Sequence, residues 1–206
     1  MKRVFLLTIA LFVAFGLSGC SYNSLTAQQQ QVKGAWADVE SQLQRRADLI
    51  PNMIKTANLS AVQEQEVFGQ ISEARSRLLN ATNAAPQGSD GDKTPEQKEA
   101  VINAANSFGG TIGRLLSIQE AYPELRSNEL FLRAQDELSG TENRIATKRE
   151  DYNKTVVTYN TARNQFPAVI TASLMGFKEE PVFKADPSAM QAPQVPDADS
   201  LRRDNK

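Results

Sequence analysis

Residues 131–166 read FLRAQDELSGTENRIATKREDYNKTVVTYNTARNQF, and a large apolar or aromatic side chain recurs in this stretch every seven residues. The positions are Phe131, Leu138, Ile145, Tyr152, Tyr159 and Phe166. Residues seven apart return to the same side of an α-helix. The spacing therefore predicts a helix of about 40 residues with one continuous buried edge.

A second pattern of this kind occupies the region just after the N-terminus. Its members recur with alternating steps of three and four: Tyr22, Leu25, Gln29, Val32, Trp36, Val39, Leu43, Arg46, Ile50, Met53 and Ala57. This heptad seam predicts a helix over residues 22–58, about 55 Å long, of the kind found in coiled coils. Pro51 has no N–H to donate to the carbonyl of Ala47, so we expect a kink or short break near residues 48–50.

Two shorter helices are expected between these long ones. The first covers residues 61–84, with Phe68, Ile71, Arg75, Leu78 and Thr82 on one side, and stops before Pro86. Residues 86–93 form a loop, and Thr94-Pro95-Glu96-Gln97 is a capping box that starts the next helix. That helix runs to about Tyr122 and buries Val101, Ala105, Phe108, Ile112, Leu115 and Gln119.

Strand-like alternation is absent, so the fold class is all-α. Four amphipathic segments joined by short connections predict an antiparallel up-and-down four-helix bundle with long first and last helices over residues 20–177. Residues 178–206 hold four of the nine prolines and few large apolar side chains. We expect them to form a disordered C-terminal tail.

The N-terminus resembles a lipoprotein export signal. Lys2 and Arg3 precede an apolar run over residues 4–17, and Leu17-Ser18-Gly19-Cys20 matches the bacterial lipobox. This run of fourteen residues is shorter than the 20 or so apolar residues that a spanning helix needs. We expect residues 1–19 to be cleaved and Cys20 to carry acyl chains that hold the protein to the membrane on the exported side. Ser21 favours the periplasmic face of the outer membrane if the organism is Gram-negative.

Composition excludes several classes of function. Loss of Lys2 and Arg3 with the signal leaves 21 basic residues against 24 acidic ones, with no basic stripe, so no nucleic acid partner is expected. The chain has no histidine and only one cysteine, which excludes a disulfide, a thiolate nucleophile and most zinc and hydrolase mechanisms. We predict no catalytic residues, no metal and no cofactor. A Ser-Lys or paired-carboxylate enzyme stays formally open, although no such pair stands out.

Four charged residues fall on or beside the apolar seams and are candidate site residues: Arg46, Arg75, Glu142 and Arg149. Charges in such places must pair or reach water. We favour a structural role, in which they pair and fix helix register. The alternative is a binding spot for an anionic group.

A second candidate set repeats a Tyr-Asn pair one heptad apart: Tyr152, Asn153, Tyr159 and Asn160. Tyrosine buries its ring while its hydroxyl finds a partner, and asparagine fixes register. We therefore favour a packing role for this aromatic and amide stripe. Stacking against a glycan is the sharper alternative.

Several ordered motifs resemble the LemA family over residues 22–183. They are Tyr22-Asn23, residues 45–52 (RRADLIPN), Glu73-Ala74-Arg75, residues 122–125 (YPEL), residues 137–146 (ELSGTENRIA), Tyr152-Asn153, Tyr159-Asn160 and Gly176-Phe177. The resemblance implies a four-helix bundle with no established enzymatic activity. Many such proteins have an N-terminal transmembrane helix, from which this chain departs. Family members often lie near genes for membrane metalloproteases, which suggests an accessory role and a membrane protease system as partner.

These observations favour a non-enzymatic, lipid-anchored envelope protein that acts as an accessory or scaffold module and docks other envelope proteins. The alternative is a binding protein for an envelope glycan or peptide, which predicts a concave pocket lined by the tyrosines and the Arg/Glu group. An envelope hydrolase would require a closely spaced catalytic constellation, and it is the least favoured.

Overall fold

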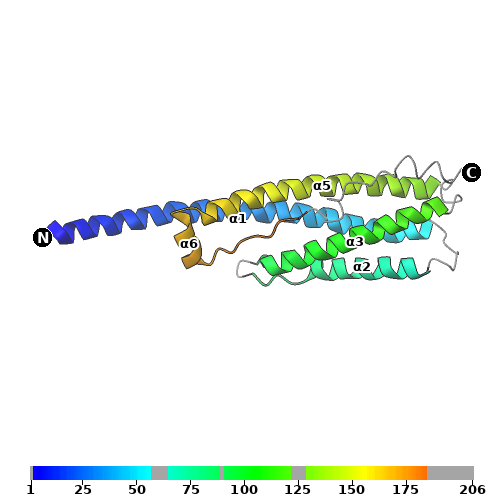
Figure 1. Cartoon of the computed structure of the whole chain (residues 1–206), viewed down its shortest axis with the longest axis horizontal. Helices are drawn as coiled ribbons and strands as arrows, with labels where there is room; N and C mark the ends of the chain where they lie inside the picture. The colour runs from blue at the N-terminus through cyan, green and yellow to red at the C-terminus, as the bar shows by residue number, and fades with distance from the viewer. Residues whose placement is uncertain (1, 57–64, 89–90, 122–128, 185–206) are drawn as a thin grey trace, which may run out of the picture.

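The computed structural model describes residues 2–56, 65–88, 91–121 and 129–184, and at residues 2–20, 56, 65 and 115–121 it describes the helical backbone only. Within these ranges all the regular structure is helical, which confirms the all-α prediction. The elements are α1 (Lys2–Thr56), α2 (Gln65–Asn83), α3 (Pro95–Ala121), α5 (Glu129–Asn164) and α6 (Ala168–Met175). Figure 1 shows the long helices with nearly aligned axes and the short α6 lying across them.

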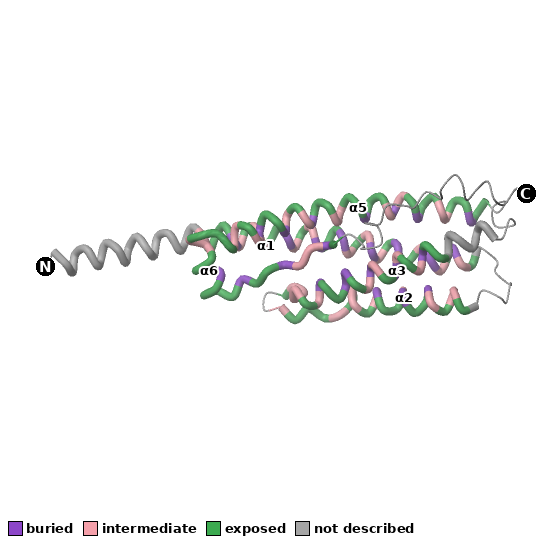
Figure 2. The backbone as a smooth tube through the Cα atoms, viewed as in Figure 1, coloured by how far each residue is buried: buried purple, intermediate pink, exposed green. Residues whose placement is uncertain are grey.

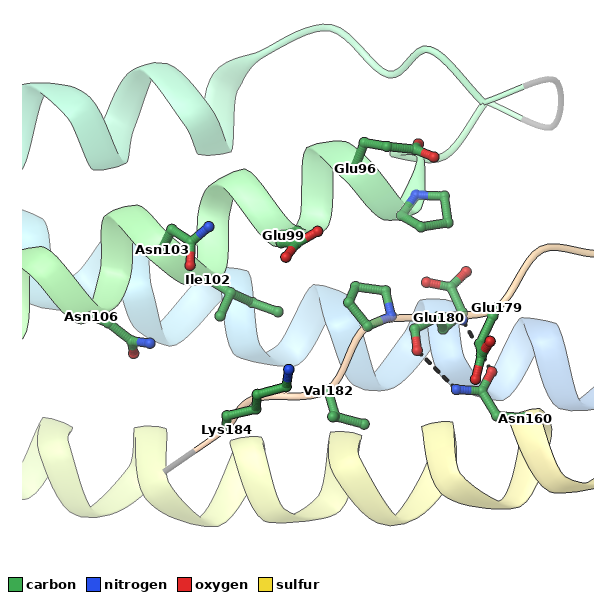
Figure 3. A pocket seen from close by; sticks show the side chains of 12 residues that line it. Glu96, Glu99, Ile102, Asn103, Asn106, Asn160, Glu179, Glu180, Val182 and Lys184 are labelled. Carbon is green, nitrogen blue, oxygen red and sulfur yellow. Dashed lines mark hydrogen bonds between the residues drawn. The ribbon is translucent and has the colours of Figure 1, made fainter. Parts of the chain in front are cut away.

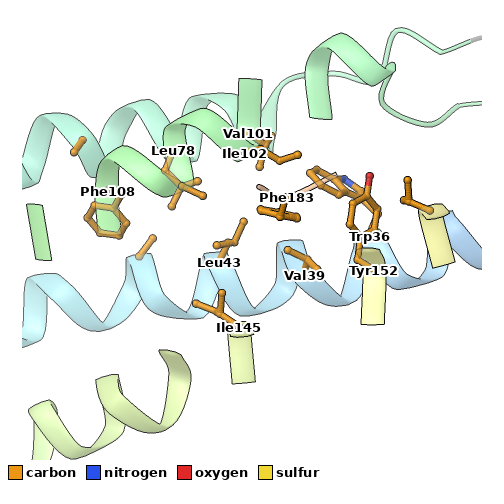
Figure 4. Packing of buried hydrophobic residues seen from close by; sticks show 14 of the residues in the cluster. Trp36, Val39, Leu43, Leu78, Val101, Ile102, Phe108, Ile145, Tyr152 and Phe183 are labelled. Atoms are coloured by element: carbon orange, nitrogen blue, oxygen red, sulfur yellow. The ribbon is translucent and has the colours of Figure 1, made fainter. Parts of the chain in front are cut away.

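The long helices contact one another in pairs. α1 packs along α5 and α2 packs along α3, while α1 also contacts α2. Large side chains fill the space between the two pairs. Figure 4 shows that the core draws on α1, α2, α3, α5 and the segment after α6, with Trp36, Leu78, Phe108, Tyr152 and Phe183 among its members.

The heptad seams predicted in the first and last long helices form this core. The predicted α1 seam is buried at Leu25, Val32, Trp36, Val39, Leu43, Arg46, Ile50 and Met53. The α5 edge is buried at Phe131, Leu138, Ile145, Tyr152 and Tyr159. The prediction for Phe166 is wrong, since its side chain is 82% exposed. α5 ends at Asn164 and the chain turns, so Phe166 no longer follows the phase of the helix.

Pro51 does not interrupt α1, which continues as a helix through Thr56. The predicted break near residues 48–50 is therefore wrong. Proline removes the donor for the carbonyl four residues before it, and here that carbonyl is Ala47. The Nε atom of Arg75 on α2 donates to this oxygen over 2.6 Å, so the carbonyl keeps a hydrogen-bond donor in place of the missing helical one.

The predicted capping box at the start of α3 is confirmed. The Thr94 N–H donates to Oε1 of Gln97 over 3.0 Å, and the Gln97 N–H donates to Oγ1 of Thr94 over 3.3 Å. Close to this capping box, Gly176 ends α6 with a φ of 75°, a conformation that favours glycine. The N–H groups of Gly176 and Phe177 both donate to the carbonyl of Ala172.

After α6 the chain turns back along the bundle. We call residues 177–184 the C-terminal strap; Figures 2 and 3 show it as an elongated segment between α3 and α5. Placing the start of the disordered tail at residue 178 was thus too early, because Glu180 and Phe183 are buried in the strap. Residues 185–206, the rest of the predicted tail, lie outside the described residues. Among the described helical residues there is no stretch with the length and apolarity needed to cross a bilayer.

Candidate functional site

The Tyr-Asn stripe of α5 holds the C-terminal strap. The Asn153 side chain accepts from the N–H of Phe183 over 2.9 Å and donates to its carbonyl over 2.8 Å. Asn160 does the same to Glu180, accepting over 3.0 Å and donating over 2.8 Å. Each amide therefore satisfies both backbone groups of one strap residue, as a neighbouring β-strand would.

The two tyrosines of the stripe donate to further backbone carbonyls of the strap. The Tyr152 hydroxyl donates to the carbonyl of Pro181 and the Tyr159 hydroxyl to that of Lys178, both over 2.9 Å. In each set a step of seven residues on α5 matches a step of three on the strap. Seven helical residues rise about 10.5 Å and three extended residues cover about 10 Å, so the two spacings agree.

Both tyrosine rings are fully buried, so no face of either is open to a glycan. The ring of Phe183 stacks on Trp36 with centroids 6.1 Å apart and meets the edge of Tyr152 at 5.7 Å. Burial, together with the nearby Glu180 and Asp92 carboxylates, raises the pKa of the Tyr152 hydroxyl well above its usual range. The hydroxyl thus remains a donor to the strap, and the described contacts of the stripe are packing contacts and hydrogen bonds to the strap backbone.

A buried lysine that the sequence analysis did not single out ties the strap to α3. The Lys98 ammonium is fully buried and lies 3.1 Å from both Asp92 and Glu180. It also lies 5.8 Å from the centre of the Trp36 ring. Lys98 comes three residues before Val101 and so follows the phase of the α3 seam, which was the available sign of its burial. Asp92, in the loop before α3, has its carboxylate engaged by this lysine.

The predicted polar cluster assembles around Arg46 and Glu142. Arg46 is 2% exposed; its Nη1 donates to the Glu142 carboxylate over 3.2 Å, and its Nη2 donates to the carbonyl of Ala105 on α3 over 2.8 Å. The guanidinium also lies over the Phe108 ring at 5.2 Å. Burial lowers the pKa of Arg46, and Glu142 opposes that change. The pair thus links α1, α3 and α5 through one side chain.

Arg149 lies in the same neighbourhood without a carboxylate partner. Its guanidinium stacks on Phe183 at 4.7 Å, and its Nε and Nη2 atoms are buried without a hydrogen-bond partner among the described residues. Burial and then the like charge of Arg46 lower its pKa to about 10, against the opposing effect of Glu142. The structure thus brings Arg46, Glu142 and Arg149 together.

Arg75 has a separate role from these three residues. Besides its bond to Ala47 it lies 3.5 Å from the Asp48 carboxylate, on the side of α1 that faces α2. The four charged candidates are therefore one cluster of three and one helix-bridging arginine. Each makes structural contacts of the kind that fix helix register.

One concave feature beside the strap is an open cleft of about 510 Å³ between α3 and α5 (Figure 3). Its lining combines carboxylates and amides with Lys184 and several apolar side chains; the carboxylates and amides include Glu96, Glu99, Asn103, Asn106, Asn160 and Glu179. The tyrosines and the arginine cluster do not line it, so it differs from the pocket expected for the ligand-binding alternative. In the part of the chain that the structure describes, no three Asp, Glu, His or Cys side chains are grouped to hold a metal ion.

The side chain of Cys20 lies outside the described residues, and only the backbone of α1 is described there. The first buried residue of the seam is Leu25. The described part of the candidate region therefore consists of the strap, the residues that hold it and the cleft beside it.

This arrangement defines an elongated all-α protein in which two pairs of long helices enclose one core and clamp an extended C-terminal strap. The sequence profile of the LemA family matches residues 35–196. The chain belongs to the LemA family.

Relatives of known name support this assignment. The chain is 28% identical over 200 residues to the magnetosome protein MamQ of Magnetospirillum gryphiswaldense, an alignment that covers 91% of this chain and 73% of that protein. It is 28% identical over 194 residues to magnetosome protein MamQ 2 of Paramagnetospirillum magneticum, covering 88% and 71%. Protein LemA of Metamycoplasma hominis is 25% identical over 182 residues, covering 88% and 76%.

Proposed function

We propose that this protein is a non-enzymatic, lipid-anchored module of the bacterial cell envelope that docks other envelope proteins close to the membrane. In this proposal Cys20 carries the acyl chains, on the exported side of the membrane and at the periplasmic face of the outer membrane in a Gram-negative cell. The four long helices act as one antiparallel up-and-down bundle. Similarity to proteins named for the magnetosome supports a role at a membrane.

One observation carries the proposal: the packed core starts almost at the anchor. Cys20 and Leu25 belong to the same unbroken helix, and Leu25 is already buried. Five helical residues rise only about 7.5 Å. A bundle held this way stands directly on the membrane surface, where its faces meet neighbouring envelope proteins.

The cleft between α3 and α5 is the docking surface that we favour. The strap forms its floor, and the bonds from Asn153, Asn160 and Lys98 fix that floor in place. A preformed cleft with acidic walls suits a basic segment of a partner, since complementary charge steers association. We propose an envelope protein as this partner, and a membrane protease system is the class to examine first.

The test is crosslinking in cells of the full-length lipoprotein followed by mass spectrometry. Glu99→Lys reverses one charge of the cleft, and the matched control Glu129→Lys changes an exposed glutamate at the start of α5. Cys20→Ala removes the anchor. We expect a discrete envelope protein that is captured by the parent chain and by Glu129→Lys and is lost with Glu99→Lys and with Cys20→Ala. Equal capture by all four chains would refute docking at the cleft.

The second candidate function is binding of an envelope peptide or glycan in the same cleft. It is favoured by the amide side chains of Asn103 and Asn106, which both donate and accept hydrogen bonds. Calorimetric titration of the purified lipoprotein with peptidoglycan fragments separates the two candidates. Saturable binding that Asn106→Ala abolishes, without a protein crosslink, would favour this second function.

A further inference from the structure

The turn after α5 and the exposed side of α6 present apolar side chains to solvent. They form an apolar patch, whose members are Phe166 (82% exposed), Val169, Ile170, Leu174 (78% exposed) and Met175. No charged residue occurs between Arg163 and Lys178. Single exposed apolar side chains are ordinary on protein surfaces. Several of them gathered on one short stretch of chain mark a surface that a membrane or another molecule covers.

The helix that carries most of the patch is packed against the rest of the protein. Thr171 and Ala172 of α6 are buried against the bundle, and α6 contacts both α1 and α5. Ile170 and Leu174 lie one turn apart and therefore share a face, which points away from the buried residues. Figures 1 and 2 show α6 crossing the axes of α1 and α5, with most of its surface exposed.

The patch adjoins the position of the predicted anchor. Phe166 and Pro167 line one small cavity together with Ser21 and Ser24 of α1, so Phe166 lies close to the residue that follows Cys20. At the start of the strap, the rings of Tyr22 and Phe177 meet edge to face, with centroids 5.8 Å apart. The exposed apolar residues of α6 are thus at the end of the bundle where α1 leaves it toward Cys20.

We infer that this patch is a membrane seat: Phe166, Val169, Ile170, Leu174 and Met175 insert into the interfacial region of the same leaflet that holds the acyl chains of Cys20. The inference rests on the proposed lipid anchor. A bundle whose α1 rises from the membrane places the crossing helix α6 along the membrane surface, as an interfacial helix lies. The anchor brings the patch to the surface at high effective concentration, so insertion follows without a separate association step.

The seat also gives the anchor a defined geometry. Acyl chains alone hold one point of a protein and leave its tilt free. A second apolar contact on the neighbouring element fixes the orientation of the long axis and therefore the height of the cleft above the bilayer. Stable membrane attachment generally takes two signals, and α6 supplies the second one beside the first.

The test places an environment-sensitive nitrobenzoxadiazole label at Leu174→Cys of the full-length lipoprotein in phosphatidylethanolamine and phosphatidylglycerol vesicles that contain a spin-labelled quencher lipid. Acylation consumes the thiol of Cys20, the only native cysteine, so the introduced thiol is the single labelling site. The matched control is Arg133→Cys, near the start of α5, where the native side chain is 76% exposed.

We expect blue-shifted emission and loss of fluorescence to the quencher lipid at residue 174, and neither at residue 133. Water-like, unquenched emission at residue 174 would overturn the inference. Blue-shifted emission without lipid quenching would also overturn it, because a second copy of the chain would then cover the patch.

The presence of the acyl chains is tested separately, by measuring the intact mass of the protein in the same preparation. If they are absent, the proposed lipid anchor fails. The label is then read in the Cys20→Ala, Leu174→Cys chain added to the same vesicles, where a blue shift and lipid quenching at residue 174 report insertion of the patch without acyl chains. Failure of the anchor and failure of the seat therefore give different results.

Discussion

Arg75 donates to the carbonyl of Ala47 over 2.6 Å, and this carbonyl is the one that Pro51 deprives of its helical donor. A residue on α2 therefore completes the hydrogen bonding of α1. A proline that sequence rules treat as a helix breaker is here a docking point for the neighbouring helix.

Arg75→Ala is expected to lower the free energy of unfolding by about 1–3 kcal/mol, because it leaves a largely buried carbonyl unsatisfied. In a Pro51→Ala background the restored N–H serves the same carbonyl, so the cost of Arg75→Ala should fall. Urea unfolding of the four chains of this double-mutant cycle measures the difference. Arg77→Ala, an exposed arginine on the same helix, should change little. Identical costs in the two backgrounds would contradict the assignment.

Asn153→Ala should release the end of the strap, because it removes both bonds to the backbone of Phe183. We expect a loss of about 1–3 kcal/mol of stability and faster hydrogen exchange at the Phe183 amide. Asn143→Ala is the matched control, since it changes an exposed asparagine of the same helix. Unchanged exchange at residue 183 in the Asn153 variant would rule out this role.

Lys98→Met tests the buried ion pairs between α3, the loop before it and the strap. The substitution keeps the volume of the side chain but leaves the carboxylates of Asp92 and Glu180 without their cation. Breaking a buried pair in this way costs about 3–5 kcal/mol, which thermal and urea unfolding would detect. Lys148→Met, which removes an exposed partner of Asp38, should have little effect. If Lys98→Met lowered the stability as little as Lys148→Met, water would have replaced the ammonium of Lys98, and the ion pairs would not be important for stability.

Arg149→Met is expected to stabilise the fold by about 1 kcal/mol, because it removes a half-buried cation close to Arg46, two of whose nitrogens are buried with no hydrogen-bond partner among the described residues. Arg46→Met should lower the free energy of unfolding instead, since it leaves the Glu142 carboxylate and the Ala105 carbonyl without their donor.

The pH dependence of stability supplies a further check. The pKa of Arg149 is about 10 in the folded state and 12.5 by reference, so the unfolded state binds more protons between those values. Wild-type stability should rise with pH across that window, and the advantage of Arg149→Met should shrink.

The heptad seams and the capping box were readable from the sequence because each depends on local periodicity. The core positions of α1 and α5 from Leu25 to Met53 and from Phe131 to Tyr159 follow directly from such spacing. Two local rules failed where a distant residue decided the outcome. α1 continues through Pro51, where Arg75 serves the carbonyl of Ala47, and the end of α5 took Phe166 out of its expected phase.

The candidate residues were found more readily than their contacts. Asn153 and Asn160 stood out by their repeat, but their partners are backbone atoms of the strap, and backbone atoms leave no mark in the sequence. Lys98 was overlooked because lysine is ordinarily exposed. Its partners Asp92 and Glu180 lie 6 and 82 residues away along the chain. Only the fold could bring all three together.

The seven-to-three match between α5 and the strap has a consequence for how this segment can change in evolution. Surface segments outside helices ordinarily accept insertions and deletions. One residue gained or lost between Glu180 and Phe183 would leave only one of the two asparagines able to engage its backbone partner, while the other would meet a neighbouring residue in the wrong orientation. The strap should therefore tolerate changes in the identity of its residues far better than any change in its length.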